Sequence, residues 1–207
     1  MPVTGAALQE KLLRSCYNSL IQLGDLSRWR ETELAGSGKR NWAPAIGFYD
    51  LASTILPQVG TAQNQLSLIA LADGNLLRGI YHLYKALSTP EQQLKPLVDN
   101  LSRAYQKIDT LADRTKIIYT RKDKTGVVTA SSFKDCYLML LSDCFRGRDI
   151  AEAAQFEGQV MLQLGLALTQ DDQRSTTYRV VFINIAGNSF AEEAFKKSGT
   201  TSMLLTS

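Results

Sequence analysis

Arg28 and a few amide side chains are the candidates for chemistry in this chain, and the chemistry that they suit is the binding of an anion. The sequence predicts a helix that carries Asn18, Asp25 and Arg28 on one face, and a later helix adds Asn64. The planar fork of an arginine can hold a phosphate or a carboxylate through two hydrogen bonds, and an asparagine amide can pair with a peptide backbone. We therefore predict a groove in which Arg28, Asn64 and Asn18 bind phosphate or peptide.

Spacing alone leaves a second interpretation of Arg28 open. Asp25 lies three residues before it and Glu31 three residues after it, and both separations allow an ion pair on one helix. In that interpretation Arg28 only stabilises its own helix.

Basic residues elsewhere form a second set of candidates, for contact with nucleic acid: Arg30, Lys39, Arg40, Arg78 and Lys85. Four aromatic residues interleave with them and could stack on unpaired bases: Trp29, Trp42, Tyr81 and Tyr84. The alternative is that the charges form solvated faces, and that Trp42 and at least one of the tyrosines pack in the core.

No constellation typical of an enzyme is present in the sequence. It has no nucleotide-binding loop and no nucleophile elbow. The one histidine, His82, lies among packing residues of a predicted helix, and the three cysteines lack metal-ligand spacing. We predict no catalytic residue, no metal site and no cofactor.

Composition indicates a chain with a substantial core. It has 207 residues, of which 44% are hydrophobic, and the formal net charge is only +3. So small a basic excess does not by itself establish a nucleic-acid partner. No stretch approaches the roughly 18 apolar residues that a membrane span needs, so we predict no membrane partner.

Apolar residues recur at helical spacing along the whole chain. Ala45, Tyr49, Ala52 and Pro57 have the spacing of the second helix of a tetratricopeptide-type hairpin, and a second unit is predicted about 34 residues further on, at Gly79. The sequence therefore predicts an all-α fold, a right-handed superhelical array of antiparallel helical hairpins with about eight helices.

Three segments are predicted along the chain. Residues 1–119 form the hairpin repeats, residues 120–197 a C-terminal helical-hairpin region, and residues 198–207 a disordered tail. The sequence carries two further local signals. Thr89-Pro90-Glu91-Gln92 has the pattern of a capping box that begins a helix, and a further helix is predicted over residues 150–168.

The segment LGDLSRWR, residues 23–30, reads as LGDxxR followed by an aromatic residue and an arginine, and it resembles the signature of the EST/SMG family. The resemblance continues through AIGFYDLASTILPQVGTAQNQLSLIALADGNLLRGIYHLYKALS. It covers residues 15–88 well and is weaker from residue 94 to residue 197. Family members are telomerase-associated subunits and factors of nonsense-mediated mRNA decay.

The resemblance implies a fold, partners and a location. Residues 1–119 would be the C-terminal part of a 14-3-3-like domain in which Arg28 grips a phosphate and Asn64 supports it. The implied partners are telomerase RNA or single-stranded telomeric DNA, phosphorylated mRNA-decay factors and other proteins, and the implied location is the nucleus, with shuttling to the cytoplasm. Because relatives carry helices before the signature, we expect this chain to be a truncated relative or a fragment.

The predicted function is a non-enzymatic scaffold that binds nucleic acid and protein, in telomere maintenance through telomerase or in nonsense-mediated mRNA decay. Two alternatives stay open at this point. One is a phosphopeptide-binding scaffold that does not touch nucleic acid, and the other is a truncated relative that has lost both activities.

Overall fold

The computed structural model describes residues 5–33, 38, 40–114, 130–147, 158, 160–161, 164–165 and 174–198. In this part of the chain every regular secondary-structure element is a helix, which confirms the all-α prediction. The described residues hold seven such helices: α1 (Gly5–Glu33), α2 (Ala43–Ile55), α3 (Thr61–Ala72), α4 (Leu76–Leu87), α5 (Leu94–Arg114), α6 (Ala130–Arg146) and α8 (Arg174–Ser198). Most of the helix predicted over residues 150–168 lies outside the described residues.

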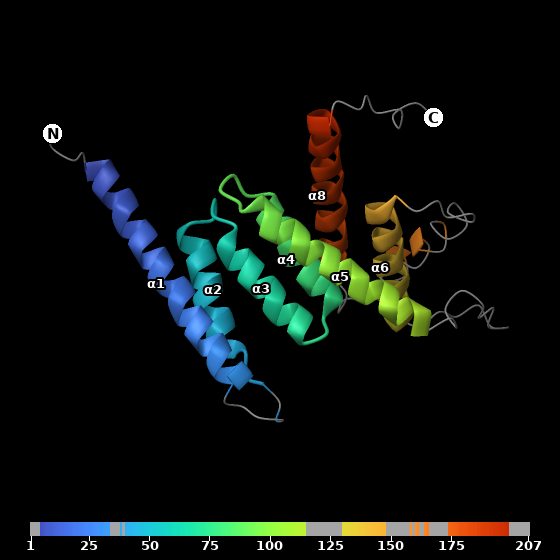
Figure 1. Ribbon diagram of the computed structural model, residues 1–207, viewed down its shortest axis with the longest axis horizontal. Coiled ribbons are helices and arrows are strands. Elements are labelled where there is room, and N and C mark those ends of the chain that lie inside the picture. Colours follow the sequence, from blue (N-terminus) through green and yellow to red (C-terminus); the bar gives the residue numbers. More distant parts are fainter. Residues whose placement is uncertain are drawn as a thin grey trace. The chain divides into compact units, whose positions relative to one another are not determined.

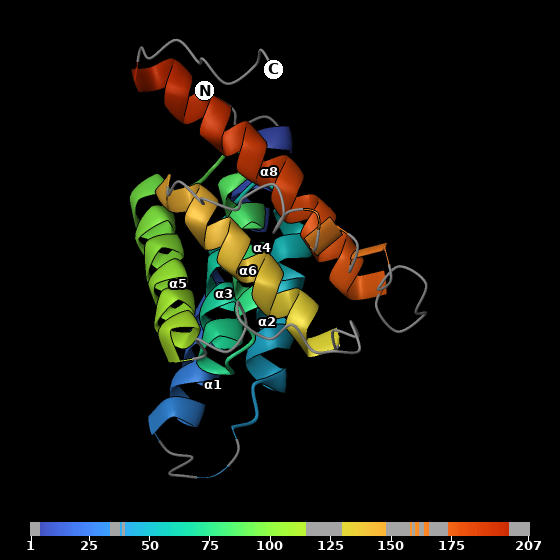
Figure 2. The same cartoon turned by 90° about the vertical axis from the view of Figure 1, so that its right-hand side faces the viewer.

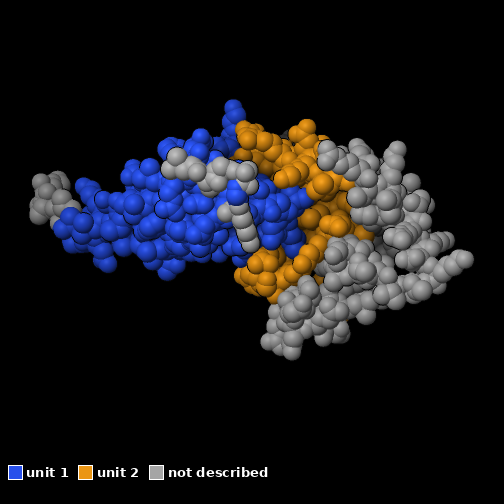
Figure 3. Space-filling model, turned by 90° about the horizontal axis from the view of Figure 1, so that it is seen from below, with its two compact units in different colours: residues 1–98, 186–207 blue, residues 99–185 orange. Residues whose placement is uncertain are grey.

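The chain divides into two compact units, which Figure 3 shows in blue and orange. Unit 1 comprises residues 1–98 and 186–207, and unit 2 comprises residues 99–185. The predicted boundary between residues 119 and 120 lies outside the described residues, so that division of the chain stays a prediction.

Unit 1 is built from two antiparallel helical hairpins. Helix α1 packs along α2, α2 packs on α3, and α3 packs along α4, so that the four helices follow one another side by side (Figure 1). Local signals set the ends of the shorter helices. Pro44 lies in the first turn of α2, Pro57 follows its end, and the Asn75 side chain accepts a hydrogen bond of 3.1 Å from Arg78 N at the start of α4.

Small residues bring these helices close together. Ala45 and Ala52 of α2 are fully buried, together with the Tyr49 ring between them. Gly79 of α4 lies so close to Leu71 that an added Cβ atom would stand 2.5 Å from a leucine methyl group. The residues that have the predicted tetratricopeptide spacing therefore lie at the contacts between helices.

The predicted capping box at Thr89 is wrong. Helix α5 begins only at Leu94, and the Thr89 hydroxyl donates instead to Ala86 O, 2.7 Å away at the end of α4. Glu91 pairs through its backbone with the α2–α3 turn: its N–H donates to Gln58 O at 2.9 Å, and its carbonyl accepts from Gly60 N at 3.0 Å. These contacts with a distant turn hold residues 89–91 outside the helix.

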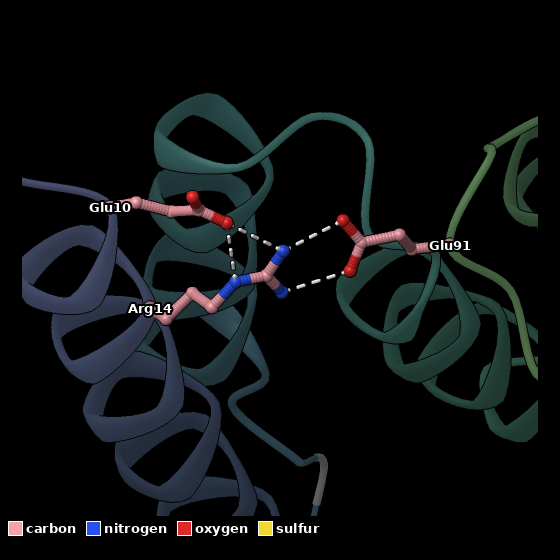
Figure 4. Close-up of polar contacts among 3 residues, drawn as sticks. All are labelled: Glu10, Arg14 and Glu91. Atoms are coloured by element: carbon pink, nitrogen blue, oxygen red, sulfur yellow. Dashed lines mark hydrogen bonds and ion pairs between the residues drawn. The ribbon is translucent and has the colours of Figure 1, made fainter. Parts of the chain in front are cut away.

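The Glu91 side chain also ties α1 to this junction. Arg14 donates to both Glu91 carboxylate oxygens, at 2.8 and 2.9 Å, and its Nε and Nη2 reach Glu10 at 3.3 and 3.2 Å (Figure 4). The Arg14 guanidinium holds the pKa of Glu91 below its ordinary value. Glu91 thus joins three segments: α1, the α2–α3 turn and the α4–α5 connection.

This lowered pKa predicts a pH dependence of stability. Glu91 contributes to stability when it is ionised, so its contribution is complete above the ordinary glutamate pKa of about 4.5 and is lost as the pH falls through the lower folded-state value. We expect the free energy of unfolding of Glu91→Gln to depend less on pH than that of the wild type below pH 4.5. Urea unfolding at several pH values would check this, and parallel pH profiles of the two proteins would contradict it.

In unit 2, α5 lies beside α6, and α6 contacts the first half of α8 (Figure 2). The Tyr105 and Phe145 rings stack with their centroids 4.6 Å apart, and Asp109 accepts from the Ser142 hydroxyl at 2.8 Å. The Tyr137 hydroxyl lies within hydrogen-bonding distance of Val180 O, at 3.1 Å, and of Asn184 Oδ1, at 2.8 Å.

Candidate functional site

The close approach of α1 and α2 positions the candidate site. Gly24 of α1 is buried against the Tyr49 ring of α2, and a Cβ atom at residue 24 would stand only 2.4 Å from that ring. Glycine is the one residue that leaves room for the ring at this distance. The glycine of the LGD segment therefore lets a large aromatic side chain of α2 reach across the face of α1.

The Tyr49 hydroxyl then meets the next residue of α1. It donates to Asp25 Oδ1 at 2.7 Å. Burial and the bond to Asp25 raise the pKa of Tyr49 well above its ordinary value, so the hydroxyl remains a proton donor at neutral pH. The same Asp25 oxygen lies 3.6 Å from Nη2 of Arg28, one helical turn further along. Tyr49 therefore fixes Asp25, and Asp25 in turn orients Arg28.

Arg28 keeps hydrogen-bonding capacity after pairing with Asp25. Its side chain is 21% exposed, while its Nε atom is buried and has no hydrogen-bond partner in the part of the chain that the structure describes. Pairing with Asp25, which the spacing left open, is thus observed, whereas Glu31 pairs instead with Arg30 at 3.2 Å and accepts from Asn41 N at 2.7 Å. The buried Nε atom is out of reach of a ligand, so a phosphate or carboxylate would contact the exposed part of the guanidinium.

The two amides predicted to share the groove, Asn18 and Asn64, lie at a different level from Arg28 along the helix axes. Asn18 is exposed and precedes Arg28 by ten residues on α1, which is about 15 Å along the helix axis. Asn64 of α3 is two residues beyond Ala62, whose N–H donates to the Tyr17 hydroxyl at 3.1 Å, so Asn64 lies near the level of Asn18. A ligand that reaches all three residues must therefore be extended, and their joint role stays a prediction.

The first three basic candidates differ in their surroundings. Arg30 is exposed and pairs with Glu31, and the Arg40 guanidinium lies 5.6 Å from the centroid of the buried Trp42 ring. Lys39 lies outside the described residues. Arg30 and Arg40 thus each have a contact within the protein, and their role toward nucleic acid stays a prediction.

Arg78 and Lys85 form a more coherent pair on α4. They are seven residues apart, which places them on one side of the helix, and both are half-buried. The Lys85 ammonium lies 6.0 Å from the centroid of the Tyr81 ring. Asp50 of α2 lies within electrostatic range of both cations; burial raises the pKa of Asp50, and the two cations oppose that rise. We call Arg78 and Lys85 the α4 cation pair.

The aromatic residues bear out the core interpretation in three positions. Trp42, Tyr81 and Tyr84 are buried, and the Trp42 indole N–H donates to Asp73 Oδ1 at 2.8 Å. Trp29, beside Arg28, is 55% exposed and is the one of the four that is available to stack on a ligand.

Sequence reasoning assigned Tyr49 to packing alone and missed its link to Asp25. A signal was present, because a fully buried tyrosine normally finds a hydrogen-bond partner for its hydroxyl. Among the described residues no group of histidine, cysteine, aspartate and glutamate side chains has the arrangement of a metal site. No helix in the described ranges is both long enough and apolar enough to cross a bilayer.

Residues 45–206 match the family model described as the Est1 DNA/RNA binding domain. The chain belongs to this family. Asn64 and the α4 cation pair lie inside the matched range, whereas Asn18, Arg28 and Arg30 precede it.

Curated relatives include telomere and mRNA-decay proteins. The chain is 34% identical over 98 residues to the telomere elongation protein est1 of Schizosaccharomyces pombe. The aligned stretch covers 46% of this chain and 20% of that protein. It is 30% identical over 99 residues to the nonsense-mediated mRNA decay factor SMG7 of Arabidopsis thaliana, 47% of this chain and 9% of that protein. It is 31% identical over 112 residues to human SMG5, 54% of this chain and 11% of that protein. The chain thus spans at most a fifth of these three relatives.

A solved structure supports the fold. This chain superposes on a chain of the Caenorhabditis elegans SMG5-SMG7 complex with a TM-score of 0.54 and 17% sequence identity, and the match covers 98% of this chain and 50% of that one. At this identity the likeness concerns the fold, and it agrees with the predicted array of helical hairpins.

Proposed function

We propose that this chain is a non-enzymatic module that binds nucleic acid and protein within a telomerase or mRNA-decay assembly. The observation that carries the proposal is the match of residues 45–206 to a DNA/RNA binding domain. Telomerase RNA or single-stranded telomeric DNA is the nucleic-acid partner in the first setting, and phosphorylated mRNA-decay factors are the protein partners in the second. The nucleus, with shuttling to the cytoplasm, is the location that goes with either role.

The α4 cation pair is the strand-contacting site in this proposal. Arg78 and Lys85 lie on one side of α4, inside the matched range, and phosphate neutralisation by such cations makes binding depend on salt. Asp50 lies within range of both and partly compensates their charge. We therefore expect modest affinity with a shallow salt dependence, about a sevenfold loss between 50 and 200 mM salt for two phosphate contacts on a single strand.

A double charge reversal tests this assignment. Arg78→Glu/Lys85→Glu should weaken binding of a labelled single-stranded oligonucleotide by at least about tenfold at low salt, because two phosphate contacts become repulsive. Lys95→Glu/Arg103→Glu is the matched control, since it changes the net charge equally at two exposed positions of α5. Fluorescence anisotropy measures both affinities. If the two variants lost affinity equally, net charge alone would explain the loss, and the α4 cation pair would not be the binding site.

The geometry of Arg28 favours a second candidate, a phosphopeptide-binding scaffold without nucleic-acid binding. Arg28 is oriented by Asp25, which is fixed by Tyr49, and 21% of its side chain stays exposed. In this candidate a phosphoserine accepts hydrogen bonds from the open side of the guanidinium. Binding of a phosphoserine peptide together with no oligonucleotide binding at any salt concentration would favour it over the first proposal.

A further inference from the structure

Arg28 shares its charge with a carboxylate inside the protein. Asp25 Oδ1 lies 3.6 Å from Nη2 of Arg28, and a carboxylate at this distance offsets much of the charge of the guanidinium. A phosphate monoester carries a charge of about −1.5 to −2 at neutral pH. Binding of phosphoserine at Arg28, the proposed function on which this inference rests, therefore calls for a second cation.

The packing of the α1–α2 hairpin brings Arg40 to the level of Arg28. Glu31 of α1 accepts a hydrogen bond of 2.7 Å from Asn41 N, so the chain returns past Glu31 before α2 begins. Arg28 precedes Glu31 by three residues, which makes the two surface neighbours about 4.5 Å apart along the helix axis. Arg40 is the residue directly before Asn41. The backbone of Arg40 therefore lies about one helical turn from the level of Arg28.

Arg40 is oriented by an aromatic ring and not by a carboxylate. Its Cζ atom lies 5.6 Å from the centroid of the Trp42 ring. Trp42 is itself fixed, because its ring is buried and its indole N–H donates to Asp73 Oδ1 at 2.8 Å. Within the ranges that the structure describes, Arg40 has no ion pair. A neutral ring holds a guanidinium in place without cancelling its charge, so that charge stays available to an anion.

Arg30 is nearer in sequence but suits this role less well. It pairs with Glu31 at 3.2 Å, and residues two apart on a helix do not face each other. The doubly charged phosphate of a phosphoserine matches two arginines better than a phosphodiester of nucleic acid, which carries one charge. We propose that Arg40 is the second cation of the Arg28 site, and that both guanidinium groups bind the phosphate of one phosphoserine.

Comparing a doubly charged ligand with a singly charged one tests this role. Arg40→Gln should weaken binding of a phosphoserine peptide about tenfold, because one charge-assisted contact is lost. The same peptide with glutamate in place of phosphoserine carries one charge there, which Arg28 alone can bind, so its affinity should fall by less than about threefold. The preference for phosphoserine over glutamate therefore decreases in Arg40→Gln. A merely structural role of Arg40 would weaken both peptides equally.

Arg30→Gln is the matched control, since it removes the same charge from the exposed residue that pairs with Glu31. It should leave both affinities within about threefold of the wild type. Isothermal titration calorimetry measures the affinities, and urea unfolding confirms that the variants are folded.

The outcomes separate this role of Arg40 from the function of Arg28. If the wild type binds the phosphoserine peptide, Arg28→Glu does not, and Arg40→Gln keeps the wild-type preference, Arg40 is not the second cation while the Arg28 site remains. Equal losses in Arg40→Gln and Arg30→Gln would also overturn the role of Arg40. Failure of the wild type to bind the peptide would overturn both, and oligonucleotide binding that depends on Arg40 would then assign this residue to nucleic acid.

Discussion

Replacing Arg28 by glutamate should reduce the affinity for a phosphoserine peptide at least about 100-fold, because the change removes a charge-assisted, two-pronged contact and puts a carboxylate opposite the phosphate. Arg28 Nη2 lies 3.6 Å from Asp25, and its Nε atom is buried without a partner in the described residues. The ligand in this account contacts the exposed part of the guanidinium and not the buried Nε atom. Isothermal titration calorimetry with a phosphoserine peptide and its unphosphorylated form measures the effect.

Two variants separate this contact from a general effect of charge. Arg30→Glu changes the net charge equally on the same helix, at an exposed residue that pairs with Glu31, and it should leave peptide affinity within about threefold of the wild type, as is usual for exposed ion pairs. Tyr49→Phe keeps Arg28 but removes the hydroxyl that fixes Asp25, so we expect an intermediate loss of about tenfold. Unchanged peptide binding by Arg28→Glu would remove the groove hypothesis.

Replacing Gly24 by alanine should lower the free energy of unfolding by about 1–2 kcal/mol, because overpacking outweighs the gain in helix propensity. The added Cβ atom would stand 2.4 Å from the Tyr49 ring, and that ring is fully buried and cannot easily move aside. Any shift of the ring also displaces the hydroxyl from Asp25. Chemical denaturation of the purified variant measures the loss.

Gly47→Ala is the control for this prediction. Gly47 is a helical glycine of α2 whose added Cβ atom would meet nothing within 4 Å. It should therefore stabilise the protein by up to about 1 kcal/mol through helix propensity alone. If Gly24→Ala behaved like Gly47→Ala, the tight contact between α1 and α2 would be contradicted.

The fold of unit 1 could be predicted from local signals. Asn75 caps the start of α4, and α3 and α4 run over Thr61–Ala72 and Leu76–Leu87, the residues expected from the sequence. The start of α5 could not be predicted in this way. Thr89-Pro90-Glu91 has the local pattern of a helix start, but Glu91 pairs with Gln58 and Gly60, more than thirty residues earlier. A long-range backbone pairing thus overrides a local capping signal.

Only part of the candidate site could be predicted, because helical spacing reveals contacts within one helix and not contacts between helices. Helical spacing identifies Asp25 and Arg28 as neighbours on α1, and the observed ion pair agrees with it. The contribution of Tyr49 depends on how closely α1 and α2 approach, which no spacing within one helix reveals. Helical spacing also could not show that Asn64 lies near the level of Asn18, because that depends on the Tyr17 contact with Ala62 on another helix.

One titration tests most directly whether this chain binds phosphate-bearing partners. A labelled single-stranded oligonucleotide is titrated with the chain at low and at physiological salt, its anisotropy is recorded, and a phosphoserine peptide is then added as competitor. We predict saturable binding that weakens with salt, and displacement by the peptide if both ligands use Arg28. Absence of oligonucleotide binding at both salt concentrations, together with no binding of the peptide, would contradict the account.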